Sequence, residues 1–117
     1  MKSESVINNM IKEKKQITKD SVMKFIGDQD MRAIFSAVRS RPMFIWEIVG
    51  ISRLPSTTAY RKIAWMIGEG LIHADIGKKR YRRFVTKIYP SIEDLTVRPF
   101  ENYVYVKMFG ERDGRVL

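Results

Sequence analysis

The stretch SRLPSTTAYRKIAWMIGEGLIHADIGKKRYRRF, residues 52–84, is the part of this chain that says most about its structure. Its first half predicts a helix, because apolar residues recur there at helical spacing: Ala59, Ile63 and Met66. Gly70 suits the left-handed conformation that ends many helices. Beyond Gly70 the pattern becomes extended and predicts two strands, 71–76 and 81–89, joined by a turn at 77–80. The stretch therefore predicts a helix followed by a β-hairpin.

The start of this helix is rich in hydroxyl groups. Pro55 suits the first positions of a helix, and Ser56, Thr57 and Thr58 follow it. Their hydroxyls can cap backbone amides or reach a ligand. Thr58 is the one that we assign to capping.

Positive charge is concentrated in the same part of the chain. Between Arg53 and Lys87 there are nine basic residues and two acidic ones, so this segment has a net charge of +7, while the whole chain has +9. A cluster of this kind is typical of proteins that bind a polyanion, because each neutralised phosphate releases condensed counterions. The alternative is a basic face that is only solvated.

Composition narrows the class of protein. With 117 residues, 44% of them hydrophobic and 30% charged, the chain is expected to form one globular domain. It contains no cysteine, which excludes disulfides and thiolate chemistry. No apolar run approaches the roughly 20 residues that span a bilayer, so a cytoplasmic protein without membrane contact is the default expectation.

Helical patterns also precede the opening stretch. An amphipathic helix is expected near the N-terminus, where the apolar residues are Val6, Ile7, Met10 and Ile11. A second stripe follows Asp30, the expected N-cap, and comprises Met31, Ile34, Phe35 and Val38. Pro42 ends that helix, and a short helix with Ile45 and Ile48 inward comes next.

Three short motifs then carry a resemblance to a known family. They are Pro42-Met43-x-x-x-Glu47-Ile48, Pro55-Ser56-Thr57-Thr58-Ala59-Tyr60-Arg61-Lys62-Ile63 and Glu69-Gly70-Leu71-Ile72. Over about residues 28–89 the chain resembles the ArsR-like winged helix-turn-helix regulators, especially archaeal ones. The resemblance implies that the third helix enters the major groove of DNA and that the hairpin, the wing, lies along the backbone or minor groove.

The expected fold class is α+β, a three-helix core with a β-hairpin wing. Residues 1–27 form an amphipathic helical extension, and residues 28–89 form the winged helix-turn-helix domain. Residues 90–109 form a second hairpin that packs on the core or on a dimer partner, and residues 110–117 form a flexible tail.

Specific DNA contacts are expected from helix 56–69, because a recognition helix presents hydrogen-bonding groups from its first turn and one outward face. The candidate residues are Ser56, Thr57, Tyr60, Arg61 and Lys62. Arg61 is the best candidate for a bidentate guanine contact, and Tyr60 has an alternative role in packing. The wing, 77–83, is expected to bind phosphates without reading sequence, through Lys78, Lys79, Arg80 and Arg82.

Several departures from the family pattern indicate a further apolar surface. Arg53 stands where glycine is frequent in the turn between helices, so the backbone there is expected to differ from the usual tight form. Ala64, Trp65, Ile67 and Trp46 occupy positions that are usually polar. With Tyr103 and Tyr105 of the second hairpin, the two tryptophans are candidates for a homodimer interface. Burial of Trp65 within the monomer is the equal alternative.

Neither an enzyme nor a metal sensor is expected. Metal-sensing ArsR-like proteins use cysteines or clustered histidines and carboxylates, whereas this chain has only His73, which is expected to be structural. No histidine base lies near a nucleophilic hydroxyl in the sequence, and no glycine-rich phosphate loop is present. We therefore expect no cofactor, no metal and no catalytic residue.

The resulting hypothesis is a sequence-specific regulator that binds double-stranded DNA as a dimer. Repression is favoured over activation because a protein this small can act by occluding a promoter. Two other classes stay open. One is a winged-helix module for protein–protein interaction, and the other is a chromatin-type or RNA-binding protein without sequence readout.

Overall fold

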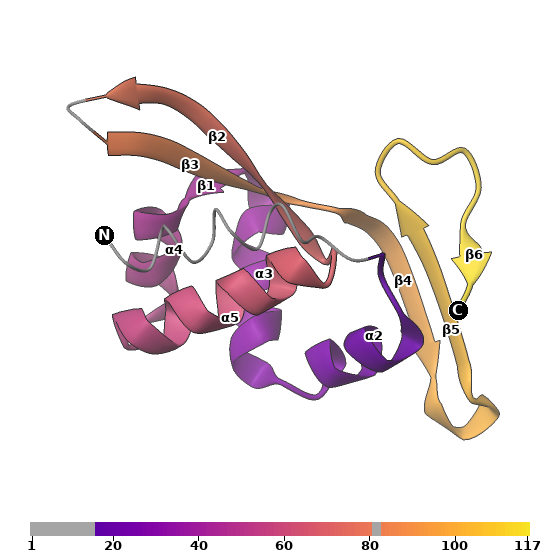
Figure 1. Cartoon of the computed structure of the whole chain (residues 1–117). Helices are drawn as coiled ribbons and strands as arrows, with labels where there is room; N and C mark the ends of the chain where they lie inside the picture. The colour runs from indigo at the N-terminus through magenta and orange to yellow at the C-terminus, as the bar shows by residue number, and fades with distance from the viewer. Residues whose placement is uncertain (1–15, 81–82) are drawn as a thin grey trace.

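The computed structural model of the chain, which describes residues 16–80 and 83–117, is an α+β structure with four helices and two antiparallel sheets in the described part (Figure 1). The helices are α2 (Lys19–Ile26), α3 (Gln29–Ser40), α4 (Ile45–Ser52) and α5 (Ser56–Gly68). The strands are β1 (Met43–Phe44), β2 (Ile72–Arg80), β3 (Arg83–Pro90), β4 (Ile92–Arg98), β5 (Tyr103–Met108) and β6 (Arg115–Val116). This arrangement is compatible with a winged-helix-like fold.

The first two described helices begin at side-chain caps. The Thr18 hydroxyl accepts a hydrogen bond from the Ser21 N–H at the start of α2. At the start of α3, Asp28 Oδ1 accepts from the Met31 N–H at 2.9 Å. The N-cap of α3 is thus Asp28 and not the predicted Asp30. Both are acidic residues ahead of the same apolar stripe, and only Asp28 has the extended backbone that a cap needs.

The turn between α4 and α5 depends on an unusual arginine. Arg53 has φ 57° and ψ 20°, the left-handed conformation that glycine adopts more easily. Arg53 thus adopts the conformation for which glycine is usually needed. Pro55 is the N-cap of α5, and in the described part of the chain the hydroxyls of Ser56, Thr57 and Thr58 cap no backbone amide. The predicted capping role of Thr58 is therefore not observed.

Helix α5 ends in a Schellman motif. Gly70 has φ 80°, its N–H donates to the Ile67 carbonyl, and the Leu71 N–H donates to the Met66 carbonyl at 3.0 Å. The chain reverses at this point, so β2 runs back alongside α5. Gly70 confirms the predicted helix end.

The first sheet has the strand order β1-β3-β2. Strand β2 continues to Arg80, which pairs with Arg83 of β3, so the prediction of a turn at 77–80 is wrong. A register shift between Ile76 and Lys79 marks a bulge in β2 that contains Gly77. The bulge accommodates the extra residue without ending the strand, and the hairpin is therefore longer than predicted.

The second sheet has the order β4-β5-β6 and forms the C-terminal end of the fold. Its first hairpin turns through a short 3₁₀ helix, Pro99–Glu101. The tail was predicted to be flexible, but its last residues pair with β5. Val116 and Arg115 pair with Tyr105 and Val106, and the Leu117 N–H donates to the Val104 carbonyl at 2.8 Å.

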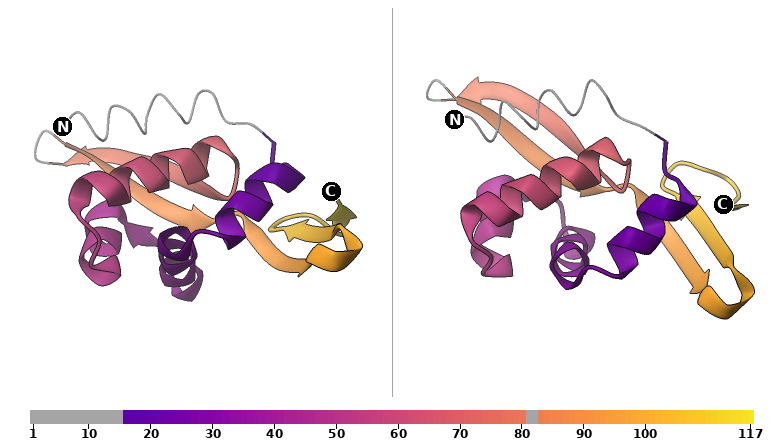
Figure 2. Two further views of the ribbon diagram at one scale, coloured as in Figure 1. Left: turned by 90° about the horizontal axis from the view of Figure 1, so that it is seen from below. Right: turned by 60° about the horizontal axis from the view of Figure 1, so that its bottom comes forward.

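One hydrophobic core joins the helices to both sheets. It includes Phe25 of α2, Ile34 of α3, Ile63 of α5, Ile88 of β3 and Val106 of β5, each no more than 4% exposed. Helix α2 and the C-terminal sheet lie side by side (Figure 2), and both contribute side chains to this core. The predicted N-terminal helix around Val6 to Ile11 lies outside the described residues. Among the helices that the structure describes, none has the length and apolarity to cross a membrane.

Candidate nucleic-acid interface

Helix α5 turns one face into the core and another outward. Ala59, Ile63 and Met66 are fully buried, as their helical spacing predicted. On the outward side Ser56, Thr57 and Arg61 are exposed. The four-residue spacing of Thr57 and Arg61 brings them together on one side of the helix. Within the described residues Arg61 has no ion-pair partner, so its guanidinium can reach a ligand.

Tyr60 differs from these residues. It is half-buried and packs against the core, which agrees with its alternative role in packing.

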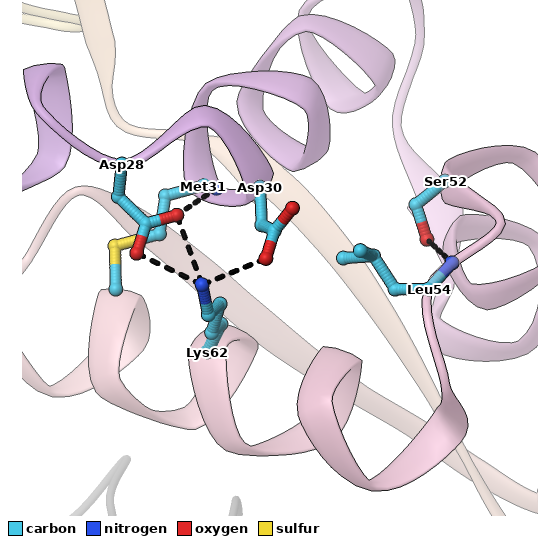
Figure 3. Close-up of polar contacts among 6 residues, drawn as sticks. All are labelled: Asp28, Asp30, Met31, Ser52, Leu54 and Lys62. Carbon is cyan, nitrogen blue, oxygen red and sulfur yellow. Dashed lines mark hydrogen bonds and ion pairs between the residues drawn. The ribbon is translucent and has the colours of Figure 1, made fainter.

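Lys62 does not belong to the outward face. Its Nζ lies 2.9 Å from Asp28 Oδ2 and 2.8 Å from Asp30 Oδ2, at the start of α3 (Figure 3). Only 16% of its side chain is exposed. Lys62 therefore ties α5 to α3, and its ammonium group is engaged by these two carboxylates instead of pointing freely outward as predicted.

The same contacts change the acidity of the groups. Hydrogen bonds to Asp30 and Asp28 raise the pKa of Lys62. For Asp28, desolvation raises the pKa, but the hydrogen bonds from Lys62 and the Met31 N–H outweigh it and lower the pKa below its usual value. Asp28 thus serves as both helix cap and ion-pair partner.

The double role of Asp28 predicts an acid-sensitive contribution to stability. A carboxyl whose pKa is lower in the folded state stabilises the fold above its unfolded pKa, and this contribution is lost as pH falls through the folded pKa. Asp28→Ala removes both cap and ion pair and is expected to cost about 1–3 kcal/mol of unfolding free energy at pH 7. Asp28→Asn keeps a cap acceptor and should cost less. Urea unfolding at pH 7 and pH 3 measures both.

At pH 3 the difference between wild type and Asp28→Ala should shrink, because the unfolded wild-type chain is then largely protonated at Asp28, and folding against the lowered pKa of Asp28 gains less than at pH 7. Equal differences at the two pH values would show that the ion pair does not stabilise the fold.

Arg53 is a candidate that the sequence prediction did not include. It is exposed in the turn that leads into α5, close in sequence to Ser56 and Thr57. The Leu54 N–H donates to Ser52 Oγ at 3.5 Å, which helps to hold this turn (Figure 3). The signal available in the sequence was an arginine between two helices, in the turn that precedes the expected reading helix.

The long hairpin and the start of α5 lie toward the same end of the molecule (Figures 1 and 2). This follows from the reversal at Gly70, because β2 runs back beside α5 toward the end at which the helix begins. Lys78, Lys79 and Arg80 belong to the distal part of β2 instead of a turn. Arg82 lies outside the described residues.

The four residues predicted for an interaction surface differ in their exposure. Trp65 packs against the core, and Lys24 Nζ of α2 lies 4.6 Å from its ring centre, which favours the intramolecular alternative. Trp46 is 70% exposed and stacks on Phe44 at 6.2 Å. Tyr103 and Tyr105 are half-exposed on the outer face of the C-terminal sheet. Ala64 and Ile67, also expected at this surface, are buried.

His73 is held by neighbouring residues of the sheet region. Its ring stacks on Tyr89 at 5.2 Å between ring centres, and Nδ1 lies 3.3 Å from Ser91 Oγ. Across the described ranges, no three histidine or acidic side chains are grouped so that they could hold a metal ion.

A scan against protein-family models gives no match, and searches of curated proteins and of solved structures give no significant match.

Proposed function

We propose that this protein is a winged-helix regulator that binds double-stranded DNA with sequence specificity, most simply as a repressor that occludes a promoter. In this proposal α5 is the recognition helix, and Ser56, Thr57 and Arg61 contact base edges in the major groove. Arg61 binds guanine through its two parallel N–H donors. The β2–β3 hairpin is the wing.

The proposal rests mainly on one observation: the exposed side of α5 and the basic β2–β3 hairpin lie toward the same end of the molecule (Figures 1 and 2). Exposed hydroxyls and an arginine without an ion-pair partner in the described chain lie on α5, and the basic hairpin extends toward the end where α5 begins. Base reading needs hydrogen-bonding groups on a protruding helix, whereas phosphate binding needs cations beside it. A solvated basic face would need neither the hydroxyls nor this alignment.

In this proposal Lys62 positions the recognition helix and is not one of the residues that contact bases. Its contacts with Asp28 and Asp30 fix the position of α5 against α3. A recognition helix that is held rigidly loses less freedom when it binds. Arg53, exposed in the preceding turn, joins the proposal as a phosphate contact.

One observation favours a second function, that of a protein-interaction module. Trp46 is largely exposed on α4 and stacks on Phe44, and Ile51 on the same helix is 55% exposed. Exposed aromatic groups are common at protein interfaces. A partner bound through apolar contacts would associate with little dependence on salt, so the salt slope separates the two functions.

Binding to duplex DNA is expected to weaken steeply with salt. Each phosphate contact contributes about −0.9 to the slope of log affinity against log salt concentration. Replacing Lys79 of the hairpin by alanine should make this slope shallower by about one unit and should weaken all duplex sequences alike. Fluorescence anisotropy of a labelled duplex, measured over a series of salt concentrations, gives both values.

Lys107→Ala is the matched control, because Lys107 lies in β5 and pairs with Glu93 at 2.9 Å. It should leave the slope unchanged. A wild-type slope near zero would exclude phosphate binding as the main interaction.

A further inference from the structure

The tip of the β4–β5 hairpin carries an aromatic side chain with no cover. Phe100 is 105% exposed in the 3₁₀ turn that joins the two strands. The tip itself is well held, since the Asn102 N–H donates to the Pro99 carbonyl and Lys19 Nζ of α2 donates to the Asn102 carbonyl at 2.8 Å. Phe100 is therefore presented to solvent by an ordered turn.

A depression lies beside this tip, on the outer face of the sheet. Its volume is about 490 Å³, and it is lined by Thr96, Arg98, Glu101, Tyr103 and Tyr105. A cavity of roughly 150 Å³ is enough to hold benzene, so the depression can accept a phenylalanine ring. Val116, 58% exposed, pairs with Tyr105 and lies on the same face.

The charges in this region are suited to a second copy of the same chain. Residues 92–117 contain four basic and five acidic residues, a net charge of −1, although the whole chain carries +9. Two copies can therefore approach through this end without the repulsion that the basic remainder would cause. The sheet also lies away from α4 and from the start of α5, so both remain accessible (Figure 1).

The depression also contains an ion pair that can change partners. Arg98 Nη1 lies 3.7 Å from Glu101 Oε1, and both side chains are more than 60% exposed. In a two-fold symmetric interface every contact occurs twice: if one residue of the first copy meets a second residue of the other copy, the reverse contact also forms. Arg98 of one copy can thus pair with Glu101 of the other, twice.

We propose that the outer face of the C-terminal sheet is a self-association surface, in which Phe100 of each copy enters the depression between Tyr103 and Tyr105 of the other. The two rings and the two exchanged ion pairs make the contact self-complementary. The surface differs from Trp65, which is covered within the monomer, and from Trp46 on α4. It does not require DNA binding.

Sedimentation equilibrium of the full chain without DNA tests this surface. The contact is small, so the dissociation constant of the dimer is expected to be roughly micromolar, and the protein is measured from about 1 to 500 µM. Phe100→Asp should weaken dimerisation by at least about 30-fold, the effect typical of a central interface residue. Trp46→Asp, a change of an equally large exposed ring on α4, should leave the dimer unchanged.

A charge exchange gives a second and independent test. Arg98→Glu and Glu101→Arg should each weaken self-association, because like charges then meet at both ends of the interface. An equimolar mixture of the two variants should dimerise more strongly than either alone, since opposite charges meet again. A monomeric wild type, an unaffected Phe100→Asp variant, or a mixture no stronger than its components would each overturn the proposal. Circular dichroism spectra establish that the variants are folded.

Discussion

Replacing Phe25 by alanine is expected to lower the free energy of unfolding by about 3–5 kcal/mol. Phe25 lies on α2, is 4% exposed and meets the Phe35 ring edge-on at 5.3 Å between ring centres. Its removal leaves a cavity between α2 and α3, where the surrounding side chains can relax only in part. Urea unfolding followed by circular dichroism measures the loss.

The matched control lies two residues earlier on the same helix. Met23 is 39% exposed, so Met23→Ala should change the unfolding free energy by no more than about 0.5 kcal/mol. If Phe25→Ala were equally mild, α2 would be an extension of the fold and not part of its core.

Replacing Arg61 by alanine is expected to cost roughly 1–3 kcal/mol of affinity for the preferred duplex, which is about 5- to 150-fold. The guanidinium of Arg61 is exposed on α5 and has no ion-pair partner in the described part of the chain, so its loss should leave the fold intact. Discrimination at one base pair should relax at the same time. Anisotropy titrations with the preferred duplex and its single-base variants measure both effects.

Arg112→Ala is the control for loss of one positive charge, because Arg112 is exposed near the C-terminus. It should weaken preferred and random duplexes slightly and alike. Equal losses on both kinds of duplex for Arg61→Ala would remove Arg61 from the base-reading residues and leave it as a phosphate contact.

The helix that carries the proposed contacts could be predicted because its signals are local. Ala59, Ile63 and Met66 follow helical spacing, and Gly70 adopts the positive φ that ends the helix. Both depend on residues close together in the chain. The extended pattern after Gly70 predicted the hairpin for the same reason.

The position of the hairpin turn could not be predicted in this way. Gly77 and the cations after it resemble a turn, yet the strand absorbs Gly77 in a bulge and continues to Arg80. A local pattern cannot distinguish a turn from a bulge, because the difference depends on the register with β3. The C-terminal tail is a similar case, since Val116 pairs with Tyr105 across a loop.

The role of Lys62 was also hidden from a local interpretation. It follows Arg61 directly and looks equivalent to it, but 34 residues separate it from Asp28, the carboxylate that it contacts. Adjacent positions on a helix differ in direction by about 100°, so one cation faces outward and the next faces α3. Only the packing of the two helices separates these two roles.

If α5 reads a particular base sequence, a selected duplex should outcompete random DNA for the protein, and a competition experiment measures this difference. Duplexes selected in vitro for binding to the wild-type protein would compete with a labelled selected duplex, alongside random duplexes of equal length, at physiological salt. We expect the selected duplex to compete at least about a thousandfold more effectively than random DNA. Equal competition by the two would contradict it and would indicate a protein that binds nucleic acid by charge alone.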